Sequence, residues 1–368
     1  MKRGALRLLM TTDAVGGVWT YAIDLASELA KAGVRTTLAM MGPSPGPDQM
    51  REARGIPGLQ LIDTVLPLDW TAREPAELEA AARTVTDLAR RHRADVVHLN
   101  SPALAAYARF EAPVIGACHS CVGTWWDAVR GGDLPEDLAW RAEALAKGYA
   151  ACDALVAPSL AFAEATAARY GVARPRVIHN GRRLSIDEQP RSDRVIFTSG
   201  RLWDAGKNLA ALDAAAAQLD VPVFAAGPLE SPVGERAQLS HLHLLGRLPQ
   251  AEVACWTAHA QVFVSTALYE PFGLSVLEAA QARCALVLSD IATFRELWDG
   301  AAVFVPATDE DALARALQSL LDDPAMARRL GEAAQARAGL YTVQSMAAGM
   351  LDLYRALART PALEEAAA

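Results

Sequence analysis

Residues 269–280 place two glutamates around a glycine-containing turn, a pattern typical of a site that binds hydroxyl groups and phosphate. Glu270 stands before the expected start of a helix, and Glu278 stands inside it. At a rise of about 1.5 Å per residue, Glu278 lies about 7–8 Å along the axis from a start near Gly273. One carboxylate could then hold hydroxyls on one side of a diphosphate and the other those on the far side. The alternative is a helix-start charge at Glu270 and an exposed Glu278.

The turn between the two glutamates also offers backbone groups to a ligand. Gly273 lets the backbone approach a ligand closely. The free N–H groups at the start of the helix, together with the positive end of its dipole, favour phosphate oxygens or sugar hydroxyls. We therefore expect Gly273, Leu274 and Ser275 to bind through their amides.

A second segment, 197–208, carries two cations across a glycine-containing loop. Arg201 and Lys207 are six positions apart, which allows both to converge on one anion instead of lining a single helical face. A pyrophosphate is the natural ligand for such a pair. Solvated surface charges are the alternative, and the position after an expected strand favours the binding interpretation.

Two segments of the first half could complete the site. Gly16 and Gly17 follow the first expected strand without G-x-G-x-x-G spacing, and no acidic residue ends the second strand, so a standard NAD site is disfavoured. His119 is expected to end a strand, where it can point into a cleft. His98 lies inside a strand, and for both histidines a buried, hydrogen-bonded core position is the alternative.

The elements that must position these residues alternate between short apolar runs and longer stretches of helical periodicity. Parallel strands need long crossovers, so the alternation predicts an α/β fold of two doubly wound sheets, with a polar linker at 180–193. A cleft between two such domains is where we expect the chemistry. The expected strands are 5–10, 35–41, 59–65, 95–99, 113–119, 154–157, 177–179, 194–198, 221–226, 242–245, 261–265, 285–289 and 302–305, and the clearest helices are 18–32, 76–91, 136–151, 309–322, 325–338 and 343–357.

Composition bounds the class of protein. The chain has 368 residues, 52% of them hydrophobic, which is enough for about two domains with real cores. A net charge of −8 disfavours a nucleic-acid coat. No apolar run of about 18 residues predicts a membrane span, although a peripheral membrane contact stays open. Five scattered cysteines and no evident export signal favour a cytoplasmic setting, and Cys118 and Cys121 are expected to pack in apolar surroundings, not to bind metal.

Taken in order along the chain, these segments resemble the retaining glycosyltransferases of the GT-B fold, in family 4 (glycosyl transferases group 1). The likeness rests on Glu270 and Glu278 in a Glu-Pro-Phe-Gly-Leu context and on the Gly-Arg-Leu, short loop, Lys pattern of 199–208. It extends to Gly16-Gly17, His119, 179–181 and 245–247. The resemblance implies an acceptor-side Rossmann-like domain at 1–185, a nucleotide-sugar donor domain at 186–340, and a helix within 341–368 that crosses back to the first domain.

The resemblance also implies roles for individual residues in a metal-independent, hexosyltransferase-type enzyme without a cofactor. Arg201 and Lys207 would neutralise the donor diphosphate and stabilise it as a leaving group. Glu270 would bind sugar hydroxyls and Glu278 the nucleotide ribose. The remaining expected contacts are His119 over the sugar, Gly16 and Gly17 beside the diphosphate, and the amides of Phe272, Gly273, Leu274 and Ser275 on the sugar and phosphate.

Several features limit what the resemblance implies. The leaving phosphate itself would deprotonate the acceptor, so no enzymatic base is assigned. Arg182-Arg183 stand where an acidic residue is common and would add positive potential near the cleft. Residues 309–311 are expected to cap a helix, not to bind a metal.

The substrates are only partly determined by the sequence. The donor is a nucleotide sugar of unassigned sugar and base. The acceptor, whether a small molecule, a glycan or lipid-linked, would contact first-domain loops, in which Trp125 and Trp126 either stack on it or pack at an interface. The alternatives are a catalytically silent nucleotide-sugar-binding protein and a nucleotide-sugar epimerase.

Overall fold

The first half of the chain forms one parallel sheet. The computed structural model describes residues 5–183, 194–232, 234 and 236–359. Seven strands are arranged in the order β3-β2-β1-β4-β5-β6-β7, and their central members are buried aliphatic runs, as expected for a sheet covered on both faces. The strands are β1 (Arg7–Asp13), β2 (Arg35–Met41), β3 (Leu59–Leu66), β4 (Val96–Leu99), β5 (Val114–Ala117), β6 (Ala154–Ala157) and β7 (Arg176–Val177).

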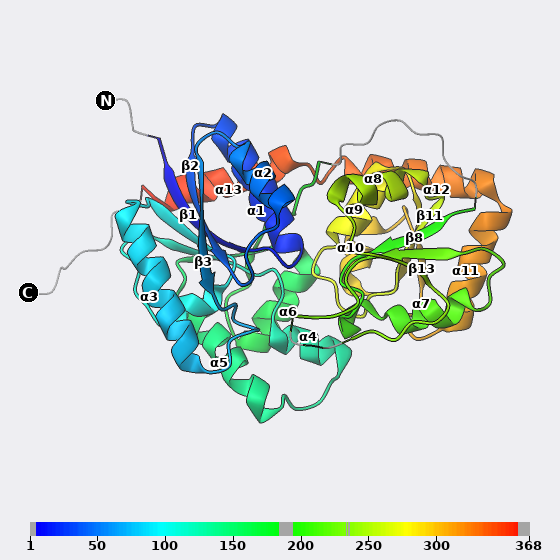
Figure 1. The fold of residues 1–368 in the computed structure, drawn as a ribbon, viewed down its shortest axis with the longest axis horizontal. Helices are drawn as coiled ribbons and strands as arrows, with labels where there is room; N and C mark the ends of the chain where they lie inside the picture. Colours follow the sequence, from blue (N-terminus) through cyan, green and yellow to red (C-terminus); the bar gives the residue numbers. More distant parts are fainter. Residues whose placement is uncertain (1–4, 184–193, 233, 235, 360–368) are drawn as a thin grey trace, which may run out of the picture.

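The second half repeats this architecture. Six parallel strands have the order β10-β9-β8-β11-β12-β13, which confirms the prediction of two doubly wound α/β sheets. Figure 1 shows the two sheets side by side in separate lobes, with helices around each. The strands are β8 (Ile196–Ser199), β9 (Val223–Ala226), β10 (His243–Gly246), β11 (Val262–Ser265), β12 (Ala285–Ser289) and β13 (Val303–Val305).

Helices supply the crossovers between successive strands. In the first lobe these are α1 (Gly17–Lys31), α2 (Pro47–Arg54), α3 (Pro75–Arg91), α4 (Val122–Val129), α5 (Glu136–Ala151) and α6 (Leu160–Tyr170), with a 3₁₀ turn η1 (Pro102–Ala106). In the second they are η2 (Ala205–Lys207), α7 (Leu209–Ala216), α8 (Gln250–His259), α9 (Leu274–Gln281), α10 (Ala292–Trp298), α11 (Glu310–Asp322) and α12 (Pro324–Ala338). Asp309 accepts a hydrogen bond from Ala312 N at 2.8 Å and so caps α11, as expected.

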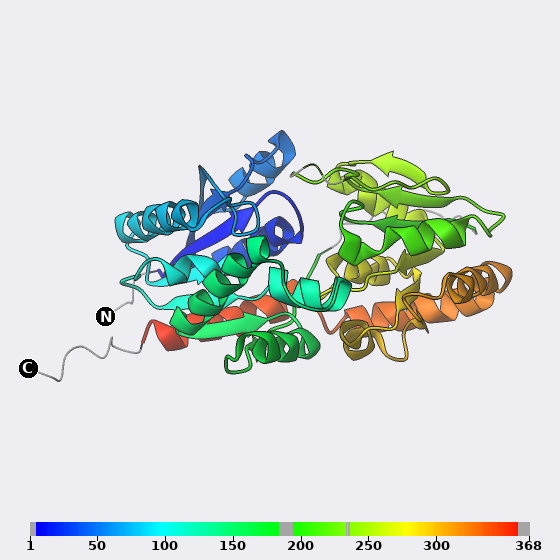
Figure 2. The ribbon, with the colours of Figure 1, turned by 90° about the horizontal axis from the view of Figure 1, so that it is seen from below.

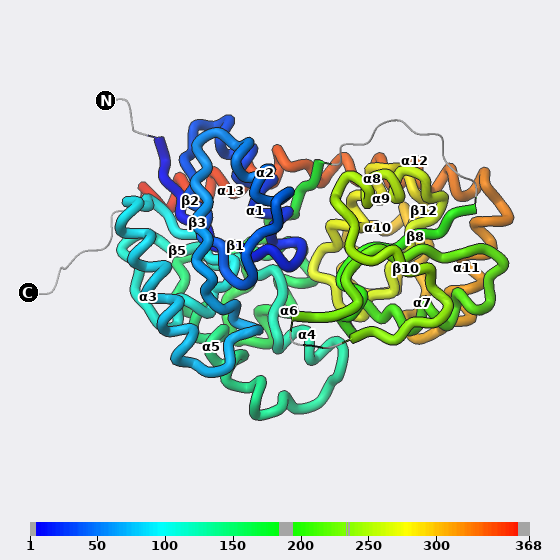
Figure 3. The backbone as a smooth tube through the Cα atoms, in the orientation of Figure 1, coloured from blue at the N-terminus to red at the C-terminus, as the bar shows by residue number. Residues whose placement is uncertain are grey.

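The last helix, α13 (Val343–Leu357), belongs to the first lobe by its packing. Met346, Met350 and Tyr354 are buried in the core cluster that α1 forms with the first sheet. The Tyr354 hydroxyl lies 2.6 Å from Nδ1 of the buried His98. Figures 2 and 3 show α13, in red, lying along the first lobe, and α12, in orange, along the second. The chain therefore crosses between the lobes twice.

Three sequence expectations differ from the structure or fall outside it. The first strand continues to Asp13, beyond the expected 5–10, because Thr11 Oγ1 accepts a hydrogen bond from Asn100 N at 2.8 Å and its side chain is thereby accommodated inside the fold. β5 ends at Ala117, so His119 lies two residues past the strand instead of ending it. The proposed boundary between 185 and 186, and most of the linker 180–193, lie outside the described residues, so the division stays a prediction.

Gly181 shows why the chain is tightly constrained where it leaves the first lobe. A Cβ at this position would lie 2.2 Å from the carbonyl oxygen of Thr342, just before α13. The Gly181 N–H also points to the Met346 sulfur at 3.2 Å. Only glycine permits this approach, so the two crossings between the lobes are held against each other.

Candidate functional site

Two loops at the carboxyl edge of the second sheet are hydrogen-bonded into one unit. The carbonyl of Gly206, after β8, accepts hydrogen bonds from the amides of Leu268 and Tyr269, after β11, at 2.9 and 3.2 Å. Thr266 Oγ1 donates to the carbonyl of Lys207 at 3.0 Å. The two loops that carry the expected cations and the expected glutamate therefore have a fixed relation to each other.

This unit brings Lys207 and Glu270 together. Lys207 Nζ and Glu270 Oε2 form an ion pair, and the two side chains are only 20% and 12% exposed. Glu270 is thus more than a charge at a helix start. Its carboxylate balances a cation, which would be free for a diphosphate once the pair opened.

Arg201 has its own carboxylate partner, Asp204, which the sequence analysis did not single out. Arg201 Nη2 donates to Asp204 Oδ2 at 2.6 Å, and Asp204 Oδ1 accepts from Gly206 N at 2.9 Å. Burial disfavours the charged form of Asp204, but Arg201 and Lys207 outweigh it and lower the pKa of the carboxyl. The site therefore holds two cations and two carboxylates in balance.

The first lobe covers this charged group through its glycine pair. A Cβ on Gly16 would lie 3.7 Å from Arg201 Nη1, and one on Gly17 would lie 3.3 Å from Leu274 Cδ1. Gly16 precedes α1, and no side chain caps the first amides of that helix. Backbone of the first lobe thus directly faces the Arg201 guanidinium across the gap between the lobes.

Helix α9 begins where a ligand would need free amides. Gly273 is its N-cap residue at φ 90°, a value that favours glycine. Phe272 is 3% exposed and its ring belongs to the core of the second lobe, so it can serve a ligand only through its backbone. Leu274 and Ser275 are half-buried at the first turn.

Glu278 is not the exposed residue that the alternative interpretation requires. It is 8% exposed, and its Oε1 accepts hydrogen bonds from Arg182 Nε at 2.6 Å and Gln250 Nε2 at 3.2 Å. Arg182 also donates to Asp24 Oδ2 in α1 at 2.9 Å, and Arg183 pairs with Glu28. The positive potential expected from the two arginines is therefore compensated by carboxylates.

The two histidines differ in their surroundings. His98 is fully buried, and its pKa falls to about 3 because burial disfavours the charged ring, so it is a core residue. His119 is half-buried, with Nε2 2.7 Å from Asn100 Oδ1 and its ring edge-on to Tyr21. Burial lowers its pKa to about 4, so the His119 ring is neutral near pH 7.

Contacts between the lobes hold the residues on both sides of Glu270. The Tyr269 hydroxyl accepts from Cys121 N at 3.2 Å and lies 2.9 Å from Thr124 Oγ1. Ser159 Oγ donates to the carbonyl of Pro271 at 2.7 Å. Cys121 follows His119 by two positions, so these contacts bring the His119 segment to the same edge as Glu270.

Trp125 has an interface role of the kind left open by the sequence. Its Nε1 donates to Asp204 Oδ1 at 3.1 Å, which ties α4 of the first lobe to the loop of Arg201. The residues missed from the sequence are Asp204, Tyr269 and Asp24, the last of these as a partner of Arg182. Asp204 stands inside the segment 199–208, where an acid beside two cations was the available signal.

The cysteines and acidic residues offer no metal centre in the described part of the chain. Cys118 and Cys121 are buried free thiols whose pKa is raised by burial, in agreement with a packing role. Nowhere in residues 5–183, 194–232, 234 and 236–359 do three His, Cys, Asp or Glu side chains gather in a way that could hold a metal ion. Helices in those ranges also include none long and apolar enough to cross a membrane.

Two family models match successive parts of the chain. Residues 15–185 match the model described as Glycosyltransferase Family 4, and residues 185–337 match Glycosyl transferases group 1. Together they span both lobes and meet near the predicted boundary.

Curated relatives include two enzymes that act on inositol compounds by name. The chain is 34% identical over 151 residues to the phosphatidyl-myo-inositol mannosyltransferase of Mycolicibacterium smegmatis, covering 38% of this chain and 39% of that protein. It is 27% identical to the D-inositol 3-phosphate glycosyltransferase of Streptomyces avermitilis, over 94% of this chain and 84% of that protein. The chain matches less than half of the length of the other relatives named here: 39% of the mannosyltransferase and 22% of the glycogen synthase of Mycobacterium tuberculosis.

Solved structures share the fold across nearly the whole chain. A sucrose-phosphate synthase from Thermosynechococcus elongatus superposes with a TM-score of 0.79 at 21% identity, covering 96% of this chain and 99% of that one. Anabaena Alr3699/HepE, solved in complex with UDP-glucose, gives 0.74 at 16% identity, covering 96% and 100%.

Proposed function

This chain belongs to the GT-B glycosyltransferases of group 1, and we propose that it moves a sugar from a nucleoside diphosphate to an acceptor hydroxyl with retention of configuration. The proposal rests on one observation above all. Lys207 pairs with Glu270 in the second lobe, while Arg201 beside them faces the backbone of Gly16 in the first. The two relatives named as a mannosyltransferase and a glycosyltransferase support sugar transfer, and the UDP-glucose complex of HepE supports a nucleotide sugar as donor.

The charges of this group suit departure of a diphosphate. As the bond from sugar to phosphate breaks, negative charge grows on the leaving oxygen, and preorganised cations stabilise it most strongly at that stage. Arg201 and Lys207 are held by Asp204 and Glu270 before the donor arrives. On binding, the phosphates would take over one face of each cation, and this protein supplies the countercharge from its own side chains without requiring a metal.

Glu270, once released from Lys207, would accept hydrogen bonds from sugar hydroxyls. Glu278 would hold the ribose diol, with Arg182 and Gln250 fixing one of its oxygens. The amides from Phe272 to Ser275 would bind sugar and phosphate at the start of α9. His119 enters this scheme as a neutral ring over the sugar because burial keeps its pKa near 4.

Retention would follow from a front-face displacement. The acceptor hydroxyl approaches the anomeric carbon on the side of the departing phosphate and gives its proton to that phosphate. The protein's part is to hold donor and acceptor in contact and to stabilise the charge that develops. No side chain is assigned as a base.

Turnover measurements on single variants test the proposal. The donor is first found by thermal-shift titration with UDP-, GDP- and ADP-linked glucose and mannose, because a ligand that binds only the folded chain must raise its melting temperature. Release of nucleoside diphosphate is then measured for the wild type, Lys207→Ala and Glu270→Gln. We expect losses of about 100-fold or more, as for removal of a group that stabilises charge in the transition state.

An exposed ion pair provides the matched control. Lys147 and Glu143 form a pair on α5 with both side chains 65% exposed. Lys147→Ala and Glu143→Gln remove the same groups far from the second sheet and should leave turnover unchanged. Wild-type rates in both Lys207→Ala and Glu270→Gln, or saturable donor binding without any turnover, would instead favour a silent binding protein.

A further inference from the structure

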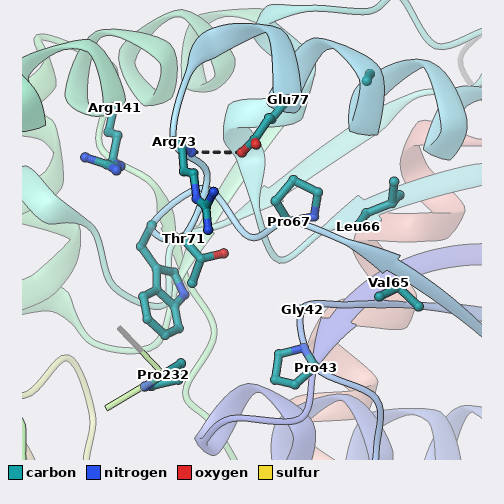
Figure 4. A pocket seen from close by; sticks show the side chains of 12 residues that line it. Gly42, Pro43, Val65, Leu66, Pro67, Thr71, Arg73, Glu77, Arg141 and Pro232 are labelled. Carbon is teal, nitrogen blue, oxygen red and sulfur yellow. Dashed lines mark hydrogen bonds between the residues drawn. The ribbon is translucent and has the colours of Figure 1, made fainter. Parts of the chain in front are cut away.

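A hollow of about 1000 Å³ lies at the carboxyl edge of the first sheet, apart from the donor residues. Its walls come from the ends of β2 and β3 and the segment leading into α3, with Pro232 added from the second lobe. Figure 4 shows Pro43, Leu66 and Val65 toward one side and Arg141, Arg73 and Glu77 toward the other. Because both lobes line it, the hollow opens onto the gap between them.

The hollow exposes large apolar side chains that the fold does not use. Val65 is 69% exposed and Trp70 is 36% exposed. The described part of the chain has three other exposed large hydrophobic residues, and none of them lines this hollow. Apolar side chains that line a concave surface are typical of a ligand site, because a bound ligand removes their apolar surface from water.

Val65 is also held in a strained backbone conformation. Its φ is 54°, a left-handed value that is rare for a β-branched residue. The register between β2 and β3 shifts at this point, between Met40 and Met41, and Thr64 Oγ1 donates to the Met40 carbonyl. The irregularity leaves the Val65 side chain exposed on the wall of the hollow instead of in the core, and strain of this kind is concentrated at functional sites.

The protein itself uses part of the polar side of the hollow. Arg141 donates to the carbonyls of Ala72 and Asp137 at 2.7 and 2.8 Å. Glu77 accepts a hydrogen bond from the Arg73 amide at 2.8 Å. A ligand here would therefore meet an apolar wall formed by Val65, Leu66 and Trp70, with the Arg73 and Arg141 side chains on the other side.

A chain of acidic residues connects the hollow with the donor residues. The Trp70 amide donates to Asp69 Oδ1 at 3.0 Å. Burial, with a further contribution from the charge of Asp13, raises the pKa of Asp69 to about 6. Asp13 ends β1 opposite Met41 of β2, next to Gly42 on the wall of the hollow, and it stands three residues before Gly16, which faces Arg201. The hollow is thus adjacent to the place where an acceptor hydroxyl would meet the donor sugar.

We propose that this hollow, lined by Val65, Trp70 and Pro232, binds an apolar aglycone of the acceptor. The identification of the ligand as the acceptor rests on the proposed function. The binding of an apolar group in the hollow does not depend on it. An acceptor of this class presents its hydroxyl toward Asp13 and Asp69 and lays its apolar part against Trp70. A purely polar acceptor would leave the apolar surface around Trp70 exposed to water.

A matched pair of glycosides tests the proposal on the full chain with UDP present. Phenyl β-D-glucopyranoside and methyl β-D-glucopyranoside differ only in the aglycone, and saturation-transfer NMR measures their binding. We expect the phenyl glycoside to bind about tenfold more tightly or better, because a phenyl ring buries far more apolar area than a methyl group. Trp70→Ala and Val65→Asn should each reduce the phenyl glycoside to the affinity of the methyl glycoside.

Val65→Asn separates ligand binding from structural damage. Asparagine tolerates left-handed φ values better than valine. The free energy of unfolding should therefore rise or stay constant while affinity for the phenyl glycoside falls. Leu340→Ala removes an apolar side chain that is 62% exposed between α12 and α13, and it should change neither quantity.

Two results would overturn the proposal. One is equal affinity of the wild type for both glycosides, and the other is undiminished phenyl binding in both Trp70→Ala and Val65→Asn. Water-dependent turnover of the donor should persist in Leu340→Ala, the variant outside the hollow. If the wild type turns over no nucleotide sugar yet binds the phenyl glycoside through Trp70, the proposed enzymatic function fails while the apolar site stands.

Discussion

Arg182 Nε donates to Glu278 Oε1 over 2.6 Å, and through this contact one buried guanidinium joins the two lobes. The same side chain, 8% exposed, reaches Asp24 in α1 with Nη1 at 2.9 Å. Burial opposes the charged form of Arg182, but Glu278 and Asp24 outweigh it and keep the pKa above its ordinary value. The proposed ribose-binding carboxylate is therefore part of a charge-balanced contact between the lobes.

Arg182→Met tests how much of the fold and the donor site depends on this contact. Removing one partner of a buried ion pair leaves the other uncompensated, which typically costs about 3–5 kcal/mol. Here the change would leave both Glu278 and Asp24 without their common cation. We expect a fall of about 3 kcal/mol or more in the free energy of unfolding, measured with urea, together with weaker donor binding.

The adjacent arginine provides the control for that measurement. The Arg183 side chain is 53% exposed. It pairs with Glu28, which lies in α1 as Asp24 does, and the hydrogen bonds and ion pairs of the described residues do not join it to Glu278. Because exposed pairs contribute little, Arg183→Met should change the free energy of unfolding by less than about 1 kcal/mol and leave donor affinity intact. Equal effects of the two changes would mean that the buried triad has no special role.

Asp204→Asn should change how the free energy of unfolding depends on pH in the acid range. The folded-state pKa of Asp204 is lowered, so this carboxylate contributes stability that is present above the unfolded pKa and is lost as pH falls through the folded one. Asparagine cannot pair with Arg201, so the variant should be less stable near neutral pH. At pH values below the folded pKa of Asp204, where the wild-type carboxyl is also protonated, the two proteins should converge. Urea midpoints across this range measure the effect, and parallel curves would contradict it.

The alternation of apolar runs and helical periods was sufficient to predict both sheets, because parallel strands buried on two faces leave a strong pattern. The end of β1 was not predicted. Thr11 and Asp13 have polar side chains, and only their tertiary contacts, such as the hydrogen bond between Thr11 and Asn100, make a strand of that segment. Periodicity reports average burial, and it cannot show a polar residue whose partner is far along the chain.

In the candidate site too, some residues could be predicted from local sequence patterns, and others depend on contacts far along the chain. Arg201, Lys207 and Glu270 could be selected from sequence because each follows a strand, and parallel strands bring their carboxyl ends to one edge. The contact of Arg182 with Glu278 spans 96 positions and joins two lobes, so no local pattern contains it. The arginine was noticed only as an unusual residue, and its carboxylate partners had to come from the fold.

Asp69→Asn should stabilise the protein near neutral pH. The folded-state pKa of Asp69 is about 6 against an ordinary value of 3.8, mainly because of burial. Between about pH 4 and 6 the folded protein binds more protons at this group than the unfolded chain, so stability falls as pH rises. Asparagine removes this penalty, and we expect a gain of about 1–2 kcal/mol at pH 7.

Urea unfolding at several pH values measures this gain. The wild type should lose stability from about pH 4 to 6 relative to Asp69→Asn, and the difference should be constant above that window. Asp63→Asn removes an exposed carboxylate from β3 and should change stability by less than about 0.5 kcal/mol. A stability difference that is the same at pH 4 and pH 7 would show that titration of Asp69 is not its cause.

Gly16→Ala should impair donor binding without damaging the fold. The added methyl group would lie 3.7 Å from Arg201 Nη1, an ordinary contact, and the φ of −158° at Gly16 lies outside the left-handed region. Because the ψ of −147° is outside the usual range of alanine, we expect the free energy of unfolding to fall by about 1 kcal/mol, with the fold retained. The methyl group would, however, occupy space beside the guanidinium where the donor diphosphate must approach.

We expect Gly16→Ala to weaken the binding of the nucleoside diphosphate about tenfold, as measured by calorimetry. Gly55→Ala, at the exposed end of α2 with a φ of −75°, adds the same methyl group away from both lobes' carboxyl edges and should bind normally. Since Gly16 belongs to the first lobe and Arg201 to the second, a loss confined to Gly16→Ala would require the nucleotide to lie between them. Normal binding by Gly16→Ala would mean that the diphosphate contacts Arg201 from another side.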